Sequence, residues 1–201
     1  MRSKQKPKPS ILEFDGLGTH WWISFVEKND LEACKDLLLT TVRDFENNYS
    51  RFLPDSYVSR LNEHKILTHP PRDLLDMLQA SINYFFSTNG IFNISVGAQL
   101  EQDGYGKTVD HTAKIAPNLP DLISLSDSKI TVDPSIRIDL GGIGKGWLID
   151  KLADLLEKHV GKGYLINGGG DMYINWPEPI SEASSTKAFL SRDESSLLIN
   201  P

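Results

Sequence analysis

Residues 137–147 read Arg-Ile-Asp-Leu-Gly-Gly-Ile-Gly-Lys-Gly-Trp, and this stretch carries the strongest indication of how the chain folds. Ile138 near its start, together with Ile136 just before it, is typical of a strand, and the glycines that follow predict a tight turn. From Trp147 to Val160, leucines recur at helical spacing opposite charged residues. The sequence therefore predicts a strand, a glycine-rich turn and a helix in direct succession.

The glycine-rich turn also predicts an anion-binding site. Glycines let a backbone approach a ligand closely, and the first amides of a helix attract negative charge. Lys145 adds a positive charge where a phosphate would lie. The alternative is a turn that only packs the helix against the strand, but the glycines, the lysine and Asp139 together favour a ligand.

Two common nucleotide-binding motifs are excluded at this turn. A Walker A loop requires Ser or Thr directly after its lysine, whereas Gly146 follows Lys145, and Asp139 stands in place of the first glycine. The dinucleotide fingerprint Gly-x-Gly-x-x-Gly fails because its third glycine would fall on Trp147 or Ile149. Nucleotide or diphosphate binding by a different fold is the remaining interpretation.

Along the whole chain, strands and helices follow one another in an irregular order. The patterns predict strands at 19–26, 129–133, 136–140 and 164–166, a helix capped by Asp30 that continues to Phe45, and a helix at about 72–87. Because strands and helices do not alternate regularly, the fold class is α+β rather than a doubly wound sheet.

Composition narrows the class of protein. The 201 residues carry a net charge of −6, so a basic footprint for nucleic acid is missing. Cys34 is the single cysteine, which excludes an internal disulfide and predicts a small buried apolar residue. No apolar stretch approaches the ~20 residues of a membrane span, and no apolar run follows the basic N-terminus as in a signal peptide. The chain as written is expected to be cytoplasmic.

Three further segments combine residue types that suit ligand binding. Residues 49–62 mix aromatics, hydroxyls and arginines, residues 90–98 end in Ser95-Val96-Gly97-Ala98, and residues 167–171 read Asn-Gly-Gly-Gly-Asp. In this order, the segments from Ser50 to Asn62, Gly90 to Gly97, Asp139 to Asp150 and Asn167 to Asp171 resemble the motifs of the ApbE family of FAD:protein FMN transferases. Asn93 stands where the family has aspartate, and the resemblance covers about residues 15–176, the N-terminal two-thirds of the family.

The resemblance implies an α+β, T-fold-related domain with a mixed sheet and packed helices, whose C-terminal part is missing. We expect a disordered basic tail at 1–14, the transferase-like domain at 15–176, and an unassigned tail at 177–201. Members move FMN from FAD to a threonine of a target flavoprotein with Mg²⁺, and they are often exported or membrane-anchored. The implied partner is a flavoprotein acceptor domain that bears this threonine.

The resemblance also implies site residues. Asp139, Lys145, Ser95, Val96 and Gly97 would contact FAD, and the backbone carbonyl of Gly142 would be a Mg²⁺ ligand. The family's Asp-Ala-x-x-Thr segment, which supplies its other metal ligands, has no counterpart here, so catalytic residues stay unassigned and weak activity is expected. The alternative function is a non-catalytic flavin-binding or interaction module.

Overall fold

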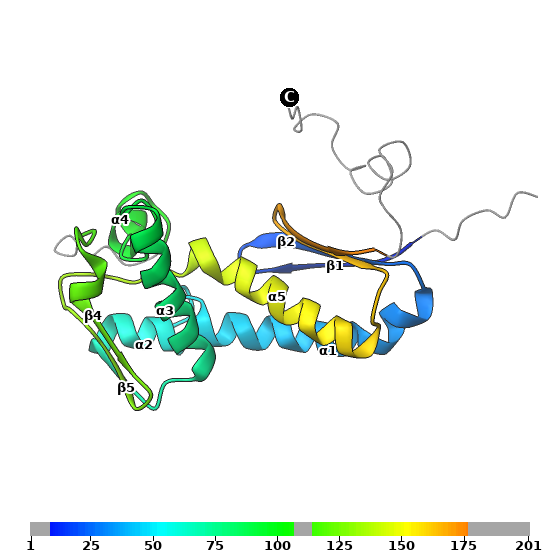
Figure 1. The fold of residues 1–201 in the computed structure, drawn as a ribbon, viewed down its shortest axis with the longest axis horizontal. Coiled ribbons are helices and arrows are strands. Elements are labelled where there is room, and N and C mark those ends of the chain that lie inside the picture. The colour runs from blue at the N-terminus through cyan, green and yellow to red at the C-terminus, as the bar shows by residue number, and fades with distance from the viewer. Residues whose placement is uncertain (1–8, 107–113, 177–201) are drawn as a thin grey trace, which may run out of the picture.

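The computed structural model describes residues 9–106 and 114–176, which form two lobes side by side (Figure 1). The sheet lobe holds an antiparallel sheet in the order β1-β2-β6-β7, covered on one face by two long helices. Its elements are β1 (Ser10–Gly16), β2 (Thr19–Phe25), α1 (Lys28–Tyr49), α5 (Gly141–His159), β6 (Tyr164–Gly168) and β7 (Asp171–Asn175).

The small lobe holds a second antiparallel sheet in the order β3-β5-β4. Its elements are α2 (Tyr57–His64), β3 (Ile66–Thr68), α3 (Arg72–Ser87), α4 (Gly97–Gln102), a 3₁₀ turn (Leu119–Leu122), β4 (Ile123–Ser126) and β5 (Lys129–Val132). The ribbon shows that α1 leads the chain from the sheet lobe to the small lobe and α5 leads it back (Figure 1). The two lobes therefore meet where α1 ends and α5 begins.

Both lobes share one hydrophobic core. In β2, Trp21, Ile23 and Phe25 are fully buried, since alternate residues of a strand point to the same face. They pack in one cluster with Leu38 of α1 and Leu148 of α5, and this cluster continues into α2, α3 and β5. An ion pair between Lys151 of α5 and Asp73 of α3 adds a polar link across the junction.

The α+β prediction is confirmed, and so are the strand that begins at residue 19 and the helix at 72–87. Cys34 is buried as expected, and burial, followed by the nearby Asp30 carboxylate, raises the pKa of its thiol. Within the described residues, no helix combines the length and the apolar composition needed to cross a bilayer.

Several expected boundaries are wrong. The tail predicted as disordered at 1–14 overlaps β1, whose residues pair with β2, while residues 1–8 lie outside the described part. The first helix begins at Lys28, after Glu27, so Asp30 lies within its first turn rather than capping it. The segment 136–140 is not a strand, because its only β-pairing with the described residues is one isolated bridge between Arg137 and Val96. The predicted tail at 177–201 lies outside the described residues.

Candidate functional site

The glycine-rich stretch forms the first two turns of α5 instead of a loop before it. The helix begins at Gly141, six residues earlier than the predicted start at Trp147. Its first amide donates to Asp139 Oδ1 at 2.7 Å, and the Gly144 amide donates to the Leu140 carbonyl at 2.7 Å. Asp139 thus satisfies an amide that would otherwise lack an intrahelical partner.

The segment before α5 is fixed from both sides. The buried Asn62 side chain of α2 donates to the Ile138 carbonyl at 2.8 Å and accepts from the Ile138 amide at 2.6 Å. On the other side, the Asp139 amide donates to the Ile94 carbonyl at 2.8 Å. Because the backbone on both sides of the Asp139 side chain is held, its carboxylate occupies a defined place.

A cavity of about 340 Å³ opens beside this first turn of α5. Its wall combines the end of α1, the loop that follows, the β1–β2 hairpin and the start of α5. The lining residues are Leu17, Gly18, Phe45, Glu46, Tyr49, Ser50, Arg51, Phe52, Leu53, Asp139, Leu140, Gly141, Gly144 and Lys145. The structure therefore brings together Asp139 and Lys145, two residues that the sequence singled out, and we name this cavity the α5 pocket.

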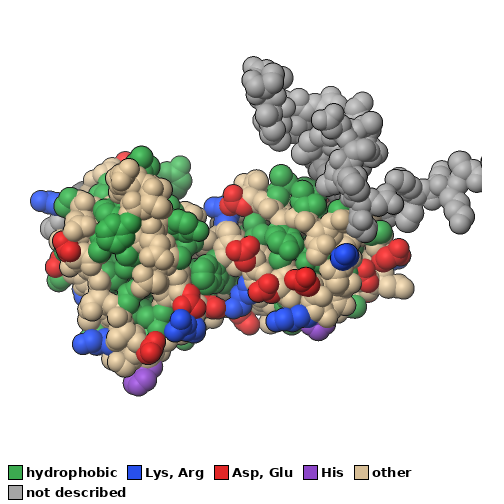
Figure 2. All heavy atoms as spheres, viewed as in Figure 1, with side chains coloured by type: hydrophobic (Ala, Val, Ile, Leu, Met, Phe, Trp, Pro, Cys, Tyr) green, Lys and Arg blue, Asp and Glu red, His purple; other side chains and the backbone are tan. Residues whose placement is uncertain are grey.

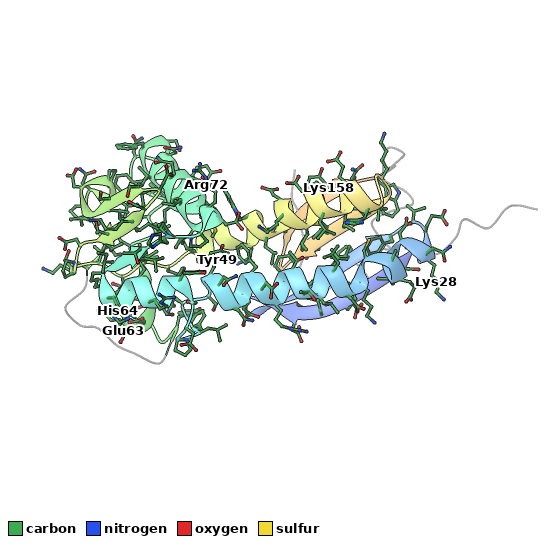
Figure 3. The ribbon with its side chains drawn as sticks, turned by 90° about the horizontal axis from the view of Figure 1, so that it is seen from below. Lys28, Tyr49, Glu63, His64, Arg72 and Lys158 are labelled. Atoms are coloured by element: carbon green, nitrogen blue, oxygen red, sulfur yellow. The ribbon has the colours of Figure 1, made fainter. Side chains whose placement is uncertain are left out.

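Figure 3 shows Tyr49 at the inner end of α1, near the junction of the lobes, and Lys158 at the far end of α5. Tyr49 lines the α5 pocket, and its ring packs against Phe45 with a centroid distance of 4.7 Å. Burial, followed by the Asp73 carboxylate and the Tyr57 hydroxyl, raises the pKa of Tyr49. Tyr49 is therefore neutral at pH 7 and contributes an aromatic wall with a polar edge.

Charges in the pocket are distributed unevenly. Arg51 and Asp139 form an ion pair through Nε and Oδ2, and their side chains are only 6% and 11% exposed. Lys145 is half-buried, and within residues 9–106 and 114–176 it makes no ion pair or hydrogen bond. Among the described residues that line the pocket, Lys145 is thus the cation left to bind a ligand anion.

The β1–β2 hairpin is a part of the pocket that sequence reasoning missed. Its two loop residues, Leu17 and Gly18, both have positive φ, of 48° and 72°, as a tight two-residue turn requires. The Leu17 amide donates to Glu46 Oε1 at 3.1 Å, which ties the turn to α1. In the sequence, Gly18 directly before the aromatic strand could have indicated this turn.

Ser95, Val96 and Gly97 are not among the residues that line the α5 pocket. Ser95 Oγ donates to Asn93 Oδ1 at 2.7 Å and accepts from the Ala116 amide, while the Gly97 amide donates to the Arg137 carbonyl at 3.1 Å. A Cβ at Gly97 would lie 2.8 Å from that carbonyl oxygen. These contacts support the segment that carries Asp139, and contact of the three residues with FAD stays a prediction.

Gly142 faces a second cavity, of about 390 Å³, on the other side of the same helical turns. Tyr84, Phe92, Trp147 and Asp150 contribute to its wall, and Figure 2 shows the surface hollowed between the two lobes. Gly142 is the second residue of α5, and a carbonyl at this position of a helix points toward the amide four residues later.

Gly142 is also the residue expected to bind a metal ion. In the part of the chain that the structure describes, no three His, Cys, Asp or Glu side chains cluster as metal ligands. The role of Gly142 as a Mg²⁺ ligand therefore stays a prediction.

Comparison with known proteins agrees with this architecture. The model of the ApbE family matches residues 17–179. Proteins named FAD:protein FMN transferase from Vibrio cholerae and Escherichia coli K12 are 24% and 25% identical, over 85% and 83% of this chain. The chain spans about half the length of these relatives, 56% and 55%.

Solved structures show the same fold. The flavin transferase ApbE from Vibrio cholerae superposes with a TM-score of 0.69 at 19% identity, over 83% of this chain and 60% of that one. The ApbE protein from Thermotoga maritima gives a TM-score of 0.72 at 19% identity, over 85% and 60% of the two chains. Since the family model covers most of the sequence, the chain belongs to the ApbE family.

Proposed function

We propose that this chain binds FAD in the α5 pocket and contributes to flavin transfer onto a protein hydroxyl. The observation that carries the proposal is one cavity of about 340 Å³ that combines an aromatic wall with a half-buried Lys145, which has no ion-pair or hydrogen-bond partner among residues 9–106 and 114–176. A volume of this size accommodates one portion of a dinucleotide. Lys145 would bind a phosphate oxygen, and the aromatic rings would pack against a planar ring.

In the proposed reaction, an acceptor hydroxyl attacks the flavin-side phosphorus of the FAD diphosphate. The bond to the bridging oxygen breaks, AMP leaves, and FMN stays joined to the acceptor as a phosphoester. Such a transfer depends mainly on placing the reactants and stabilising charge. Within the chain, Lys145 would stabilise charge on the diphosphate, and Asp139 would hold the first turn of α5 against it. The threonine acceptor and Mg²⁺ are suggested by the family resemblance.

A titration with FAD tests the binding part of this proposal. Lys145→Ala should weaken FAD binding by roughly 1–3 kcal/mol, the scale of a lost charge-assisted hydrogen bond. Lys158→Ala is the matched control, because Lys158 is an exposed lysine at the opposite end of the same helix (Figure 3). Equal FAD affinities for wild type and Lys145→Ala would show that the pocket is not the diphosphate site.

A second candidate function is flavin binding without transfer by this chain alone. It is favoured because the two carboxylates among the described lining residues, Glu46 and Asp139, are already engaged by the Leu17 amide and by Arg51. The two functions separate when the chain is incubated with FAD, Mg²⁺ and a threonine-bearing acceptor domain. Covalent flavin on the acceptor and released AMP, both measured by mass spectrometry, would establish transfer, whereas FAD binding without either product would establish the second function.

A further inference from the structure

Four charged side chains of alternating sign run from the α5 pocket into the small lobe. Arg51 pairs with Asp139 through Nε, and Nη1 of the same guanidinium lies 3.8 Å from Glu101 Oε1. Arg137 reaches this same oxygen from the other side, with Nη2 at 2.9 Å and Nε at 3.1 Å. Each charge therefore lies beside one of opposite sign.

The centre of this series is buried. The Arg51 and Glu101 side chains are 6% and 4% exposed, and Arg51 Nη2 also donates to the Tyr105 carbonyl at 2.7 Å. Charges removed from water interact strongly, and salt screens them little. The Arg51 guanidinium is consequently held in one orientation from three sides, by Asp139, Glu101 and Tyr105.

Glu101 itself does not line the α5 pocket. Its Oε2 atom is buried, and among the described residues it has no hydrogen-bond partner. A buried carboxylate oxygen without a hydrogen bond destabilises the fold, so filling the space with a side chain of this size does not explain why a glutamate stands at this position. Its charge does account for it, because Oε1 lies between two guanidinium groups that would otherwise repel each other.

We propose that Glu101 is a positioning residue for the α5 pocket. Acting through Arg51, it orients the Asp139 carboxylate toward the Gly141 amide at the start of α5. Arg137 completes the arrangement, because it lies two residues before Asp139 and binds Glu101 directly. The consequence for FAD rests on the proposed function, but the orientation of Asp139 does not.

The ligand-free protein provides the first test. In Glu101→Gln, the volume of the side chain is kept and its charge is lost, so Arg51 and Asp139 should change their relative placement. We expect the amide resonance of Gly141 in a ¹H–¹⁵N spectrum to shift, because this amide donates to Asp139. Glu63→Gln, at an exposed site of α2 (Figure 3), should leave it in place. An unchanged Gly141 resonance in folded Glu101→Gln would overturn the proposal.

Rescue distinguishes charge from packing. In the double variant Glu101→Gln/Arg137→Gln, one cation is removed together with the anion, so Arg51 no longer faces a second guanidinium. We expect the Gly141 resonance to return toward its wild-type position, and we expect this double variant to fold even if Glu101→Gln does not. A double variant that is more perturbed than Glu101→Gln would show that Glu101 and Arg137 serve packing only.

FAD titrations extend the test to the ligand. Glu101→Gln should weaken FAD binding about tenfold, within the range of couplings between interacting residues. When Asp139→Asn is already present, adding Glu101→Gln should cause little further loss, because both changes act through one carboxylate. If the two substitutions weakened FAD binding independently, so that their fold-losses multiplied in the double variant, the proposal would be overturned. Absence of FAD binding in the wild type would instead refute the proposed function, and the spectrum of the ligand-free protein would still decide the role of Glu101.

Discussion

At the scale of single residues, Asp139 is first of all an anchor of α5. One carboxylate oxygen accepts from the Gly141 amide and the other pairs with Arg51, so the chain itself engages both. The sequence singled out Asp139 as a ligand contact, and its place in the wall of the pocket is compatible with that role. A ligand would share this carboxylate with the helix and with Arg51.

Removing the charge of Asp139 should therefore destabilise the fold even without ligand. Asp139→Asn keeps an acceptor for the Gly141 amide but leaves the buried Arg51 without its closest anion. Breaking a buried ion pair costs about 3 kcal/mol of unfolding free energy. Urea denaturation measures this loss. Asp154→Asn, on the exposed side of α5, is the control and should change stability by less than about 0.5 kcal/mol.

Because of Tyr49, the free energy of unfolding should fall as the pH rises into the alkaline range. Its pKa is raised in the fold, so above pH ~10 an unfolded tyrosine loses its proton while the folded one keeps it. The unfolded state then binds fewer protons, and the free energy of unfolding falls as the pH rises. Tyr49→Phe lacks this contribution. The stability of wild type relative to Tyr49→Phe should decline between about pH 9 and 11 in urea denaturation, and a constant difference would contradict this.

At the scale of elements, replacing a glycine by alanine should change the stability in opposite directions at two helix positions, Gly146 in α5 and Gly97 in α4. A Cβ at Gly146 meets nothing within 4 Å, so Gly146→Ala should stabilise α5 by about 0.5–1 kcal/mol. A Cβ at Gly97 would lie 2.8 Å from the Arg137 carbonyl oxygen, so Gly97→Ala should destabilise the protein by roughly 2 kcal/mol. Thermal denaturation of both variants measures the signs, and equal signs would contradict the packing described for these two sites.

The elements differ in how far the sequence predicts them. Helix α3 was predicted with its bounds because apolar residues recur at helical spacing through 72–87, and Leu74, Leu75, Leu78 and Phe85 among them are buried. The start of α5 was not, since glycines disfavour a helix, and the bonds of Asp139 and Leu140 that hold it are not visible in local propensity. Helix α2 was missed because its eight residues are too few for a periodic pattern, although Ser56 caps it by accepting from the Ser59 amide.

The pocket was predicted only in part for a similar reason. Asp139 and Lys145 lie in the glycine-rich stretch and were found from it, and both line the cavity. The pairing of Arg51 with Asp139 spans 88 positions, and Glu101 joins them from a third segment. Such contacts arise from the tertiary fold, so spacing along one sequence does not indicate them. The Ser95–Gly97 segment was noticed for its composition, and the structure places it in support of residues 137–139.

At the scale of the whole molecule, the shared core predicts one cooperative unfolding transition. The hydrophobic cluster runs from Trp21 and Tyr164 in the sheet lobe to Leu61, Leu78 and Ile130 in the small lobe. Two probes report on different parts: tryptophan fluorescence senses residues 21, 22, 147 and 176, and far-ultraviolet circular dichroism senses the helices of both lobes. We expect coincident urea transitions for the two probes.

Ligand binding should shift this transition without splitting it. The α5 pocket lies where α1 ends and α5 begins, and its lining includes Leu17 from the hairpin, Phe52 from the loop after α1 and Lys145 from α5. FAD at 100 times its dissociation constant should raise the unfolding free energy by about 2.7 kcal/mol. Because the shared hydrophobic core couples the lobes, the increase should be the same for fluorescence and for circular dichroism. An increase seen by only one probe would show that the lobes unfold separately and that FAD stabilises just one of them.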